Sequence, residues 1–279
     1  MNSVILADAT GGVFSKLWED VCTLWSQSSG QYLRGARDTI LLAVVATAVG
    51  CLIGLLCGIL QTLKYQKSDF FLKKAVIWIV KAVIRVYVEV FRGTPMILQA
   101  VFIYFGLPYL TNNALRFDVI TAAYVVISIN TGAYMAETVR GGILSIDAGQ
   151  TEGAMAIGMN HFQTMVKVIL PQTLRNIIPQ IGNNLIINIK DTSVMFIIGY
   201  AELFAAHKAY VGATYLYFPS ALVTMFIYLI MTVVCSLLLR LWERLMDGPE
   251  NYDLATTDSL AHTSGMINYP SGRRRSARR

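Results

Sequence analysis

Windows without charged residues alternate with short charged segments along most of the chain. A hydrocarbon core of about 30 Å requires roughly 20 apolar residues of helix, and five windows come close to or exceed that length. They cover residues 39–63, 93–115, 119–136, 176–201 and 209–239; Pro219 marks the start of the last helix, and only Lys190 and Asp191 interrupt the fourth window. The pattern predicts an all-α, polytopic membrane protein with about five transmembrane helices.

The same pattern divides the chain into three regions. Residues 1–38 form an extracytoplasmic N-terminal segment, and residues 39–245 form a transmembrane domain with an inner loop at 141–172. Residues 246–279 form a polar cytoplasmic tail that ends in a run of arginines. Because this tail has too few apolar residues to build a core, we predict that it is disordered.

Residues 70–91 are amphipathic rather than uniformly apolar. Lys74, Lys81, Arg85 and Glu89 follow one another at spacings of seven, four and four residues, so they share one face of a helix. The simplest interpretation is an interfacial helix on the inner leaflet. The alternative is a fully inserted extra span whose lysine side chains reach back to the interface.

The first apolar window contains two overlapping GxxxG steps, formed by Gly50, Gly54 and Gly58. Small residues at this spacing allow two helix backbones to approach closely in a membrane. The glycines therefore predict tight packing of the first span against a neighbour, without indicating a function.

The composition agrees with a membrane protein. Hydrophobic residues make up 55% of the 279 residues, charged residues make up 14%, and the mean hydropathy is +0.53. Soluble domains carry roughly 25% charged residues, so this chain has too little polar surface to coat a soluble globule. A soluble enzyme, a disordered protein and a nucleic-acid-binding module are thereby disfavoured, despite the net charge of +6.

The distribution of Lys and Arg predicts the orientation. If the N-terminus is outside, the inner segments (64–92, 137–175 and the residues after 239) hold 17 Lys and Arg, and the outer segments hold five. Inner loops of membrane proteins carry the excess of positive charge. We therefore expect a multi-pass protein with its N-terminus outside and its C-terminus in the cytoplasm.

Motifs for catalysis or metal binding are missing from the sequence. The chain has no G-x-x-x-x-G-K-[ST] loop for a nucleotide, no H-E-x-x-H and no G-x-S-x-G. Its three histidines are scattered, and its four cysteines have no metal-binding spacing. We therefore expect no catalytic residues, no metal site and no cofactor bound by this chain.

Polar side chains form two stripes in the third and fourth windows. At helical spacing these are Asn130, Tyr134 and Glu137 in one, and Gln180, Asn184, Asn188 and Asp191 in the other. Polar groups in hydrocarbon are costly and normally face a partner or a water-filled cavity. The stripes predict either a substrate pathway that binds a zwitterionic amino acid, or hydrogen bonds that hold the helices together.

The charged residues in and near these stripes leave several interpretations open. Lys190 and Asp191 point about 100° apart on a helix and are expected to meet different groups, with Glu137 or a backbone carbonyl as a partner for Lys190. Each is either a functional charge or part of a structural ion pair. Glu137 and Arg140, three residues apart, form either a local surface pair or a cytoplasmic gate.

The inner loop between the third and fourth windows is long for a connection in a compact membrane protein. It predicts two short helices around Gly158, at residues 148–157 and 161–170, with Pro171 ending the second. Glu152, Gly153 and Ala154 would give the first helix a face that a partner could approach closely. The loop is thus either a docking element below the membrane or an ordinary amphipathic connector.

The loop resembles the EAA loop of bacterial ABC importer permeases. The residues that carry the resemblance are Glu152, Gly153, Ala154, Gly158, Ile169, Leu170 and Pro171, with Gly153 where the family usually has Ala. FRGTP (91–95), FIYFGLP (102–108), NTGAYMAETVRGG (130–142) and IKDTSV (189–194) resemble the branch that takes up polar amino acids, the glutamine permease type above all.

The resemblance, which runs from about residue 35 to residue 245, implies a type I permease core and a set of partners. These are a second permease subunit, identical or related; two ATPase subunits, which carry the ATP and Mg²⁺; and an extracytoplasmic amino-acid-binding protein. It also implies that Glu152, Gly153, Ala154 and Gly158 couple the permease to the ATPase, in a bacterial cell membrane. The competing hypothesis is an ATP-independent secondary carrier or channel for small polar solutes.

Overall fold

The computed structural model describes residues 2–63 and 70–247, and within these ranges all regular structure is helical. The longer helices are α1 (Asn2–Thr62), α2 (Phe71–Gly93), α5 (Val119–Leu144), α8 (Leu170–Asp191), α9 (Leu203–Thr214) and α10 (Tyr217–Asp247). The shorter ones are α3 (Met96–Val101), η1 (Phe102–Gly106), α4 (Leu107–Leu110), α6 (Ala148–Ala156), α7 (His161–Thr164), η2 (Met165–Ile169) and η3 (Thr192–Ile198). The predicted all-α class is confirmed.

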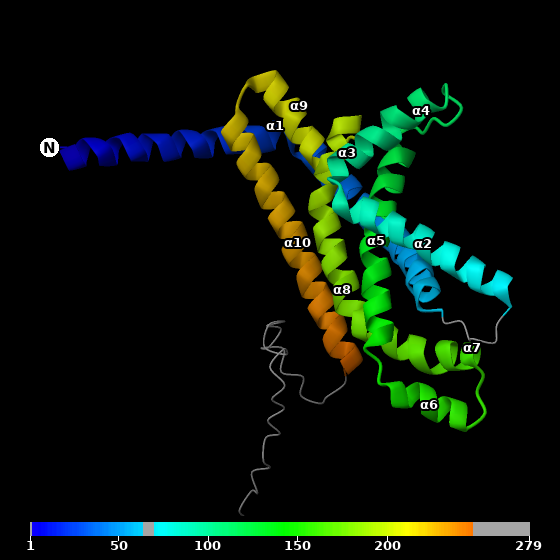
Figure 1. The fold of residues 1–279 in the computed structure, drawn as a ribbon. Coiled ribbons are helices and arrows are strands. Elements are labelled where there is room, and N and C mark those ends of the chain that lie inside the picture. Colours follow the sequence, from blue (N-terminus) through cyan, green and yellow to red (C-terminus); the bar gives the residue numbers. More distant parts are fainter. Residues whose placement is uncertain (1, 64–69, 248–279) are drawn as a thin grey trace, which may run out of the picture.

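The long helices run side by side and the short helices lie at the two ends of the bundle (Figure 1). Helices α5, α8 and α10 cross the molecule, with α6 and α7 together at one end and α4 and α9 at the other. The N-terminal part of α1 extends away from the bundle, and the helix reaches α9 at the buried Leu24. The predicted tail lies almost entirely outside the described residues, since α10 ends at Asp247.

Helices α1 and α5 pack backbone against backbone at the three predicted glycines. A Cβ atom added to Gly50 would lie 2.6 Å from the Thr131 Cβ, and one added to Gly58 would lie 2.6 Å from the Val139 Cβ. A Cβ atom on Gly54 would overlap Met135 in the same way. The small-residue pattern therefore correctly predicted close packing of α1, and its neighbour is α5.

Within residues 2–63 and 70–247, three helices are long and apolar enough to cross a membrane: α1 over Gly12–Thr62, α5, and α10 over Tyr217–Glu243. A fourth crossing results if His161–Ile198 and Leu203–Thr214, which meet at an angle of 52°, count as one broken span. The helix in the second predicted window runs only from Met96 to Leu110. At 1.5 Å per residue it is about 22 Å long, so the prediction of one full span over 93–115 is wrong.

The ends of that window explain the difference. Pro95 lacks an N–H and disfavours a helical residue before it, and α2 ends just before it, at Gly93. Past Leu110, Asn112 and Asn113 adopt positive φ angles of 50° and 65°, which end the helix. A window without charges is thus longer than the helix that it contains.

Helix α2 confirms the predicted amphipathic pattern, and the surroundings of its side chains indicate whether it lies on the membrane surface or within the membrane. Its apolar residues Leu72, Val76 and Val83 are exposed, whereas Lys81 and Arg85 line a cavity shared with α1 and α5. A helix on the membrane surface turns its polar face to the solvent. Charged residues gathered on a cavity between α1, α2 and α5, with apolar residues on the opposite side of α2, favour the inserted alternative.

Candidate functional site

A cavity of about 330 Å³ lies between α5, α8 and the start of α3, and we call it the upper cavity. Five of the eight residues predicted for a substrate pathway line it: Asn130, Tyr134, Asn184, Asn188 and Asp191. Thr94, Pro95, Met96, Thr131 and Ile187 complete the lining. The structure thus brings the two predicted polar stripes to one place.

The amide groups of the stripes also hold the helices together. The Asn188 Nδ2 donates to Thr47 Oγ1 at 2.7 Å and to Thr131 Oγ1 at 2.9 Å, which ties α8 to α1 and α5. The Asn184 Nδ2 contacts the Met135 Sδ at 3.0 Å. The two interpretations of the stripes are therefore compatible, because the nitrogen atoms are used in helix contacts while the residues still line the cavity.

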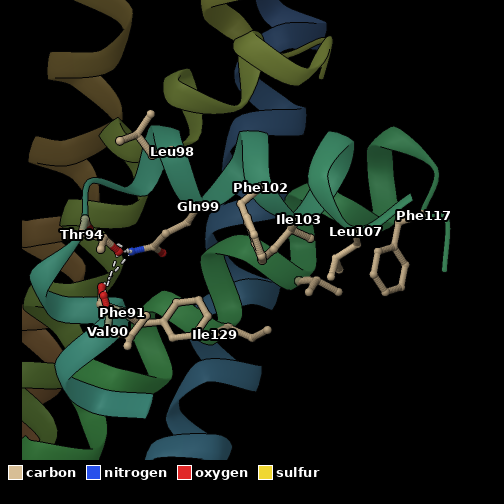
Figure 2. Close-up of a pocket in the computed structure, with 11 residues that line it drawn as sticks. Val90, Phe91, Thr94, Leu98, Gln99, Phe102, Ile103, Leu107, Phe117 and Ile129 are labelled. Atoms are coloured by element: carbon tan, nitrogen blue, oxygen red, sulfur yellow. Dashed lines mark hydrogen bonds between the residues drawn. The ribbon is translucent and has the colours of Figure 1, made fainter. Parts of the chain in front are cut away.

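The break between α2 and α3, which forms one wall of the cavity, is held by Gln99. Its Nε2 donates to the Phe91 and Thr94 carbonyls, both at 2.9 Å (Figure 2). The Asn130 Nδ2 donates to the same Phe91 carbonyl at 3.1 Å and to Gln99 Oε1 at 3.0 Å. These bonds satisfy backbone groups that Pro95 leaves without helical partners, and they fix the FRGTP segment against α5.

Sequence reasoning missed Gln99. The available signal was the one amide side chain between Met96 and Leu110, five residues after the FRGTP threonine. Beside it the structure has an apolar cavity of about 670 Å³, lined by side chains such as Phe102, Ile103, Leu107 and Phe117 (Figure 2). The polar residues in the lining of this cavity are Gln99 and Thr94, which lie at the backbone break.

The groups left over in the upper cavity are mainly hydrogen-bond acceptors. Within residues 2–63 and 70–247, no hydrogen bond reaches the Oδ1 atoms of Asn130 and Asn184 or the carboxylate of Asp191. Asp191 is the only acidic or basic side chain in the described lining. An acceptor-rich cavity with one carboxylate is suited to a ligand that carries N–H donors and a positive charge.

Three predicted pathway residues lie elsewhere. Gln180 is exposed and does not line the upper cavity. Lys190 lines a separate cavity of about 330 Å³ with Phe204, His207 and Tyr228. Glu137 forms an ion pair with Arg92, so in this structure it is paired neither with Lys190 nor with Arg140, the two partners that the sequence offered for it.

A buried carboxylate that the sequence did not reveal lies next to the Lys190 cavity. Glu202 is 1% exposed and accepts hydrogen bonds from Thr39 Oγ1 at 2.9 Å, Tyr228 Oη at 2.6 Å and the Phe204 N–H at 2.7 Å. These bonds join α1, α9 and α10 and pair the carboxylate with three donors. Glu202 stands between two apolar windows in the sequence, and its partners are distant along the chain, so no local pattern marks it.

The predicted inner loop forms helices α6 and α7 at one end of the bundle (Figure 1). Asp147 caps α6 by accepting from the Gly149 N–H at 2.6 Å. Gly158 ends it with φ of +86°, and the Met159 N–H returns to the Ala154 carbonyl at 3.1 Å. This is a Schellman-type cap, and it explains why glycine is required at position 158.

The other loop residues differ in exposure. Ala154 is buried, whereas Glu152 is largely accessible, and a Cβ added to Gly153 would have no atom within 4 Å. The prediction that Pro171 ends the second helix is wrong. The chain continues from α7 through the π-helical turn η2 into α8, and Pro171 takes the first turn of α8, where a missing N–H is tolerated.

Comparison with known proteins agrees with this geometry. The family model described as "Binding-protein-dependent transport system inner membrane component" matches residues 75–248, more than half of the chain. The chain belongs to this family. It is therefore a membrane permease subunit of an ABC importer, and the expected family and fold are confirmed.

The permease is 41% identical over 214 residues to the glutamine transport system permease protein GlnP of Escherichia coli K12, covering 77% of this chain and 92% of the relative. It is 32% identical over 212 residues to the arginine transport system permease protein ArtQ of Bacillus subtilis, covering 76% of this chain and 90% of the relative.

Solved structures place the permease in the same fold. An amino acid ABC transporter crystallised with histidines matches with a TM-score of 0.69 and 33% identity, covering 78% of this chain and 95% of that one. The MetNI methionine ABC transporter in an inward-facing conformation matches with a TM-score of 0.58 and 18% identity, which bears on the fold alone.

Proposed function

We propose that this permease forms the path of an ATP-driven importer for polar amino acids, with glutamine as its substrate. The observation that carries the proposal is the upper cavity, whose free acceptors are Asn130 Oδ1, Asn184 Oδ1 and the Asp191 carboxylate. Its volume of about 330 Å³ lies at the small end of ligand pockets, which range over about 300–1,000 Å³. The names of the relatives point to the same class of substrate.

The cavity suggests a role for each group. Asp191 is the partner of the α-ammonium group, because it is the one carboxylate in the lining. The carbonyl oxygens of Asn130 and Asn184 accept from the side-chain amide of glutamine, and the Tyr134 hydroxyl remains available as a donor. A cationic side chain such as that of arginine would be the second positive charge facing one carboxylate, which makes a neutral amide the better fit.

Transport requires partners that supply energy and deliver the substrate. We propose that two ATPase subunits, which hold the ATP and Mg²⁺, contact α6 at Glu152 and Gly153, with Ala154 and Gly158 fixing the shape of that helix. The accessible face of α6 and its place at the end of the bundle support this role. A second permease subunit and an extracytoplasmic amino-acid-binding protein complete the proposed importer, and the family's description as binding-protein-dependent supports the second of these partners.

The proposed orientation places α6 and α7 in the cytoplasm and the N-terminus outside. Helices α6 and α7 lie at the end of the bundle that also contains the end of α1 (Figure 1). The basic segments that the charge distribution assigns to the inside follow that end of α1 and include α7. In a bacterial cell membrane this puts the ATPase contact on the side that contains ATP.

Uptake by cells tests the substrate. A strain that lacks the gene for this chain is expected to lose uptake of labelled glutamine and to regain it when the gene is returned. Unlabelled glutamine should compete with the label, and unlabelled arginine should compete far less. Equal loss of arginine uptake, or unchanged glutamine uptake, would refute glutamine as the substrate.

A further inference from the structure

A second polar cavity lies one helical turn along α5 from the upper cavity, toward the end of the bundle that holds α6. This inner cavity has a volume of about 320 Å³ and is lined by Gln61, Lys81, Arg85, Val88, Glu89, Glu137 and Arg140. Tyr134 lines the upper cavity and Glu137 lines the inner one. Because these two residues are three positions apart on α5, the two cavities are neighbours along one helix face.

Arg92 lies at the boundary between the cavities. Its guanidinium group forms an ion pair with Glu137 and lies 5.3 Å from the centre of the Tyr134 ring. Two residues later, Thr94 and Pro95 line the upper cavity. Arg92 therefore contacts one wall residue of each cavity, at the point where α2 breaks.

The backbone around Arg92 is held firmly while its side chain is held by contacts that can be exchanged. Gln99 and Asn130 bind the Phe91 carbonyl next to it, which anchors the segment to α3 and α5. The Arg92 and Glu137 side chains are 38% and 39% exposed, so their ion pair is partly solvated. A pair of this kind contributes little free energy and is easily opened.

The inner cavity offers Glu137 other partners. Lys81, Arg85 and Arg140 line it together with Glu137, and none of the three makes an ion pair with another residue in 2–63 or 70–247. Arg140 is three positions after Glu137 on α5 and can reach it along the helix surface. Glu137 thus has cationic neighbours besides Arg92, of which Arg140 is on its own helix, and the structure shows Arg92 engaged.

We propose that Arg92 is the inner gate of the transport path. While Glu137 holds Arg92 over Tyr134, the guanidinium group separates the upper cavity from the inner cavity. When Glu137 exchanges Arg92 for Arg140, the boundary opens, and the amino acid passes into the inner cavity toward the cytoplasm. Neither arrangement leaves Glu137 without a positive partner, so the two states differ little in electrostatic free energy. This inference rests on the proposed path and its orientation.

The test measures access to the upper cavity from the cytoplasm. Ile187, which is 37% exposed and lines the upper cavity, is replaced by Cys in a background in which Cys22, Cys51, Cys57 and Cys235 are replaced. The assembled importer is embedded in inside-out vesicles without ATP. A membrane-impermeant trimethylammonium methanethiosulfonate is added outside the vesicle, and its rate of reaction with the cysteine is measured.

We expect Arg92→Ala to raise this rate about fivefold or more. Loss of a partly solvated ion pair and of the contact with the Tyr134 ring should shift the equilibrium toward the open arrangement by about that factor. Glu137→Gln, which keeps Arg92 but removes its partner, should raise the rate in the same direction and serves if Arg92→Ala fails to assemble. Arg175→Ala is the matched control, since it removes an exposed arginine near the start of α8 that lines neither cavity and takes no part in the ion pair. It should leave the rate unchanged.

Equal rates for Arg92→Ala, Glu137→Gln and the parent would overturn the gate, as would an equal increase for Arg175→Ala. Arg140→Gln removes the partner that Glu137 takes when the gate opens. This variant should therefore have a rate at or below the parent value, and a higher rate would contradict the exchange. The assay needs no substrate. If glutamine is not the substrate, glutamine uptake will be absent but the labelling difference between the variants will remain. If Arg92 is not the gate, the labelling difference will be absent but glutamine uptake will remain.

Discussion

Lys190 and Asp191 are adjacent in the sequence, yet they line two different cavities. Asp191 lines the upper cavity with Asn184 and Asn188, whereas Lys190 lines the cavity that contains His207 and Tyr228. Successive helical residues point about 100° apart, which places them on different sides of α8. The two charges therefore have separable roles, although both interrupt the same apolar window.

Substitution of these two residues should have unequal effects. Asp191→Asn removes the one charge of the upper cavity and should lower glutamine uptake by about tenfold or more, since a charge-assisted hydrogen bond contributes ~1.5–3 kcal/mol. Lys190→Gln should retain most of the uptake. Initial rates in cells that contain equal amounts of each variant in the membrane provide the measurement. A loss of uptake that is equal in the two variants would contradict the assignment of Asp191 to the path.

Helix α1 offers a matched pair of glycines for testing the packing against α5. Gly50→Ala brings a methyl group to 2.6 Å from the Thr131 Cβ and 2.9 Å from the Ser128 carbonyl oxygen. We expect it to lower the free energy of unfolding by about 1–3 kcal/mol, the range for overpacking. Gly30→Ala, in the same helix with open space around it, should be neutral or stabilising by up to ~1 kcal/mol because Ala favours helix.

The thermal midpoint of the purified protein in detergent distinguishes these two variants. A midpoint of Gly50→Ala at or above that of Gly30→Ala would show that α1 and α5 do not pack as closely as the structure indicates.

The buried Glu202 cluster should contribute stability. Tyr228→Phe removes the donor that lies 2.6 Å from the Glu202 carboxylate and should cost about 1.5–3 kcal/mol, the range for hydrogen bonds to charged groups. Tyr215→Phe is the control, because Tyr215 is 88% exposed and its hydroxyl makes no hydrogen bond with a described residue. Comparable thermal midpoints for the two variants, measured in detergent, would argue that the cluster is dispensable.

Gly153, which is accessible on α6, permits a test of ATPase docking that leaves the permease folded. A Cβ added to the exposed Gly153 has no atom within 4 Å, so Gly153→Leu should leave the permease folded, while the larger side chain blocks close approach of a partner. We expect the ATPase subunits to be lost on co-purification and glutamine uptake to fall with them. Gly212→Leu, at an equally open glycine in α9 at the other end of the bundle, should retain the ATPase. Retention by Gly153→Leu would exclude α6 as the contact.

The features that the sequence predicted well are those with a local period. Gly50, Gly54 and Gly58 repeat every four residues and mark a real interface, and Asn184, Asn188 and Asp191 repeat along α8 and line a real cavity. Helical spacing alone determines which side chains share a face. The break at Gly158 also identified α6, another local signal, although it could not determine what contacts the accessible face of that helix.

The features that sequence reasoning missed depend on partners far apart in the chain. Glu202 pairs with Thr39, and Glu137 pairs with Arg92 rather than with the nearer Arg140. Periodicity carries no information about such pairs, because it describes one helix at a time. Pro171 was misread for another reason, since it follows the π-helical turn η2, through which the helical path continues into α8.

Transport by the purified importer tests the central claim most directly. The permease, its second permease subunit, the ATPase subunits and the binding protein are reconstituted into sealed vesicles, and movement of labelled glutamine is measured with ATP, without ATP, and with an ion gradient alone. We predict glutamine transport that requires ATP and the binding protein and that Asp191→Asn reduces. Glutamine transport driven by an ion gradient in the absence of ATP would contradict the account and support a secondary carrier.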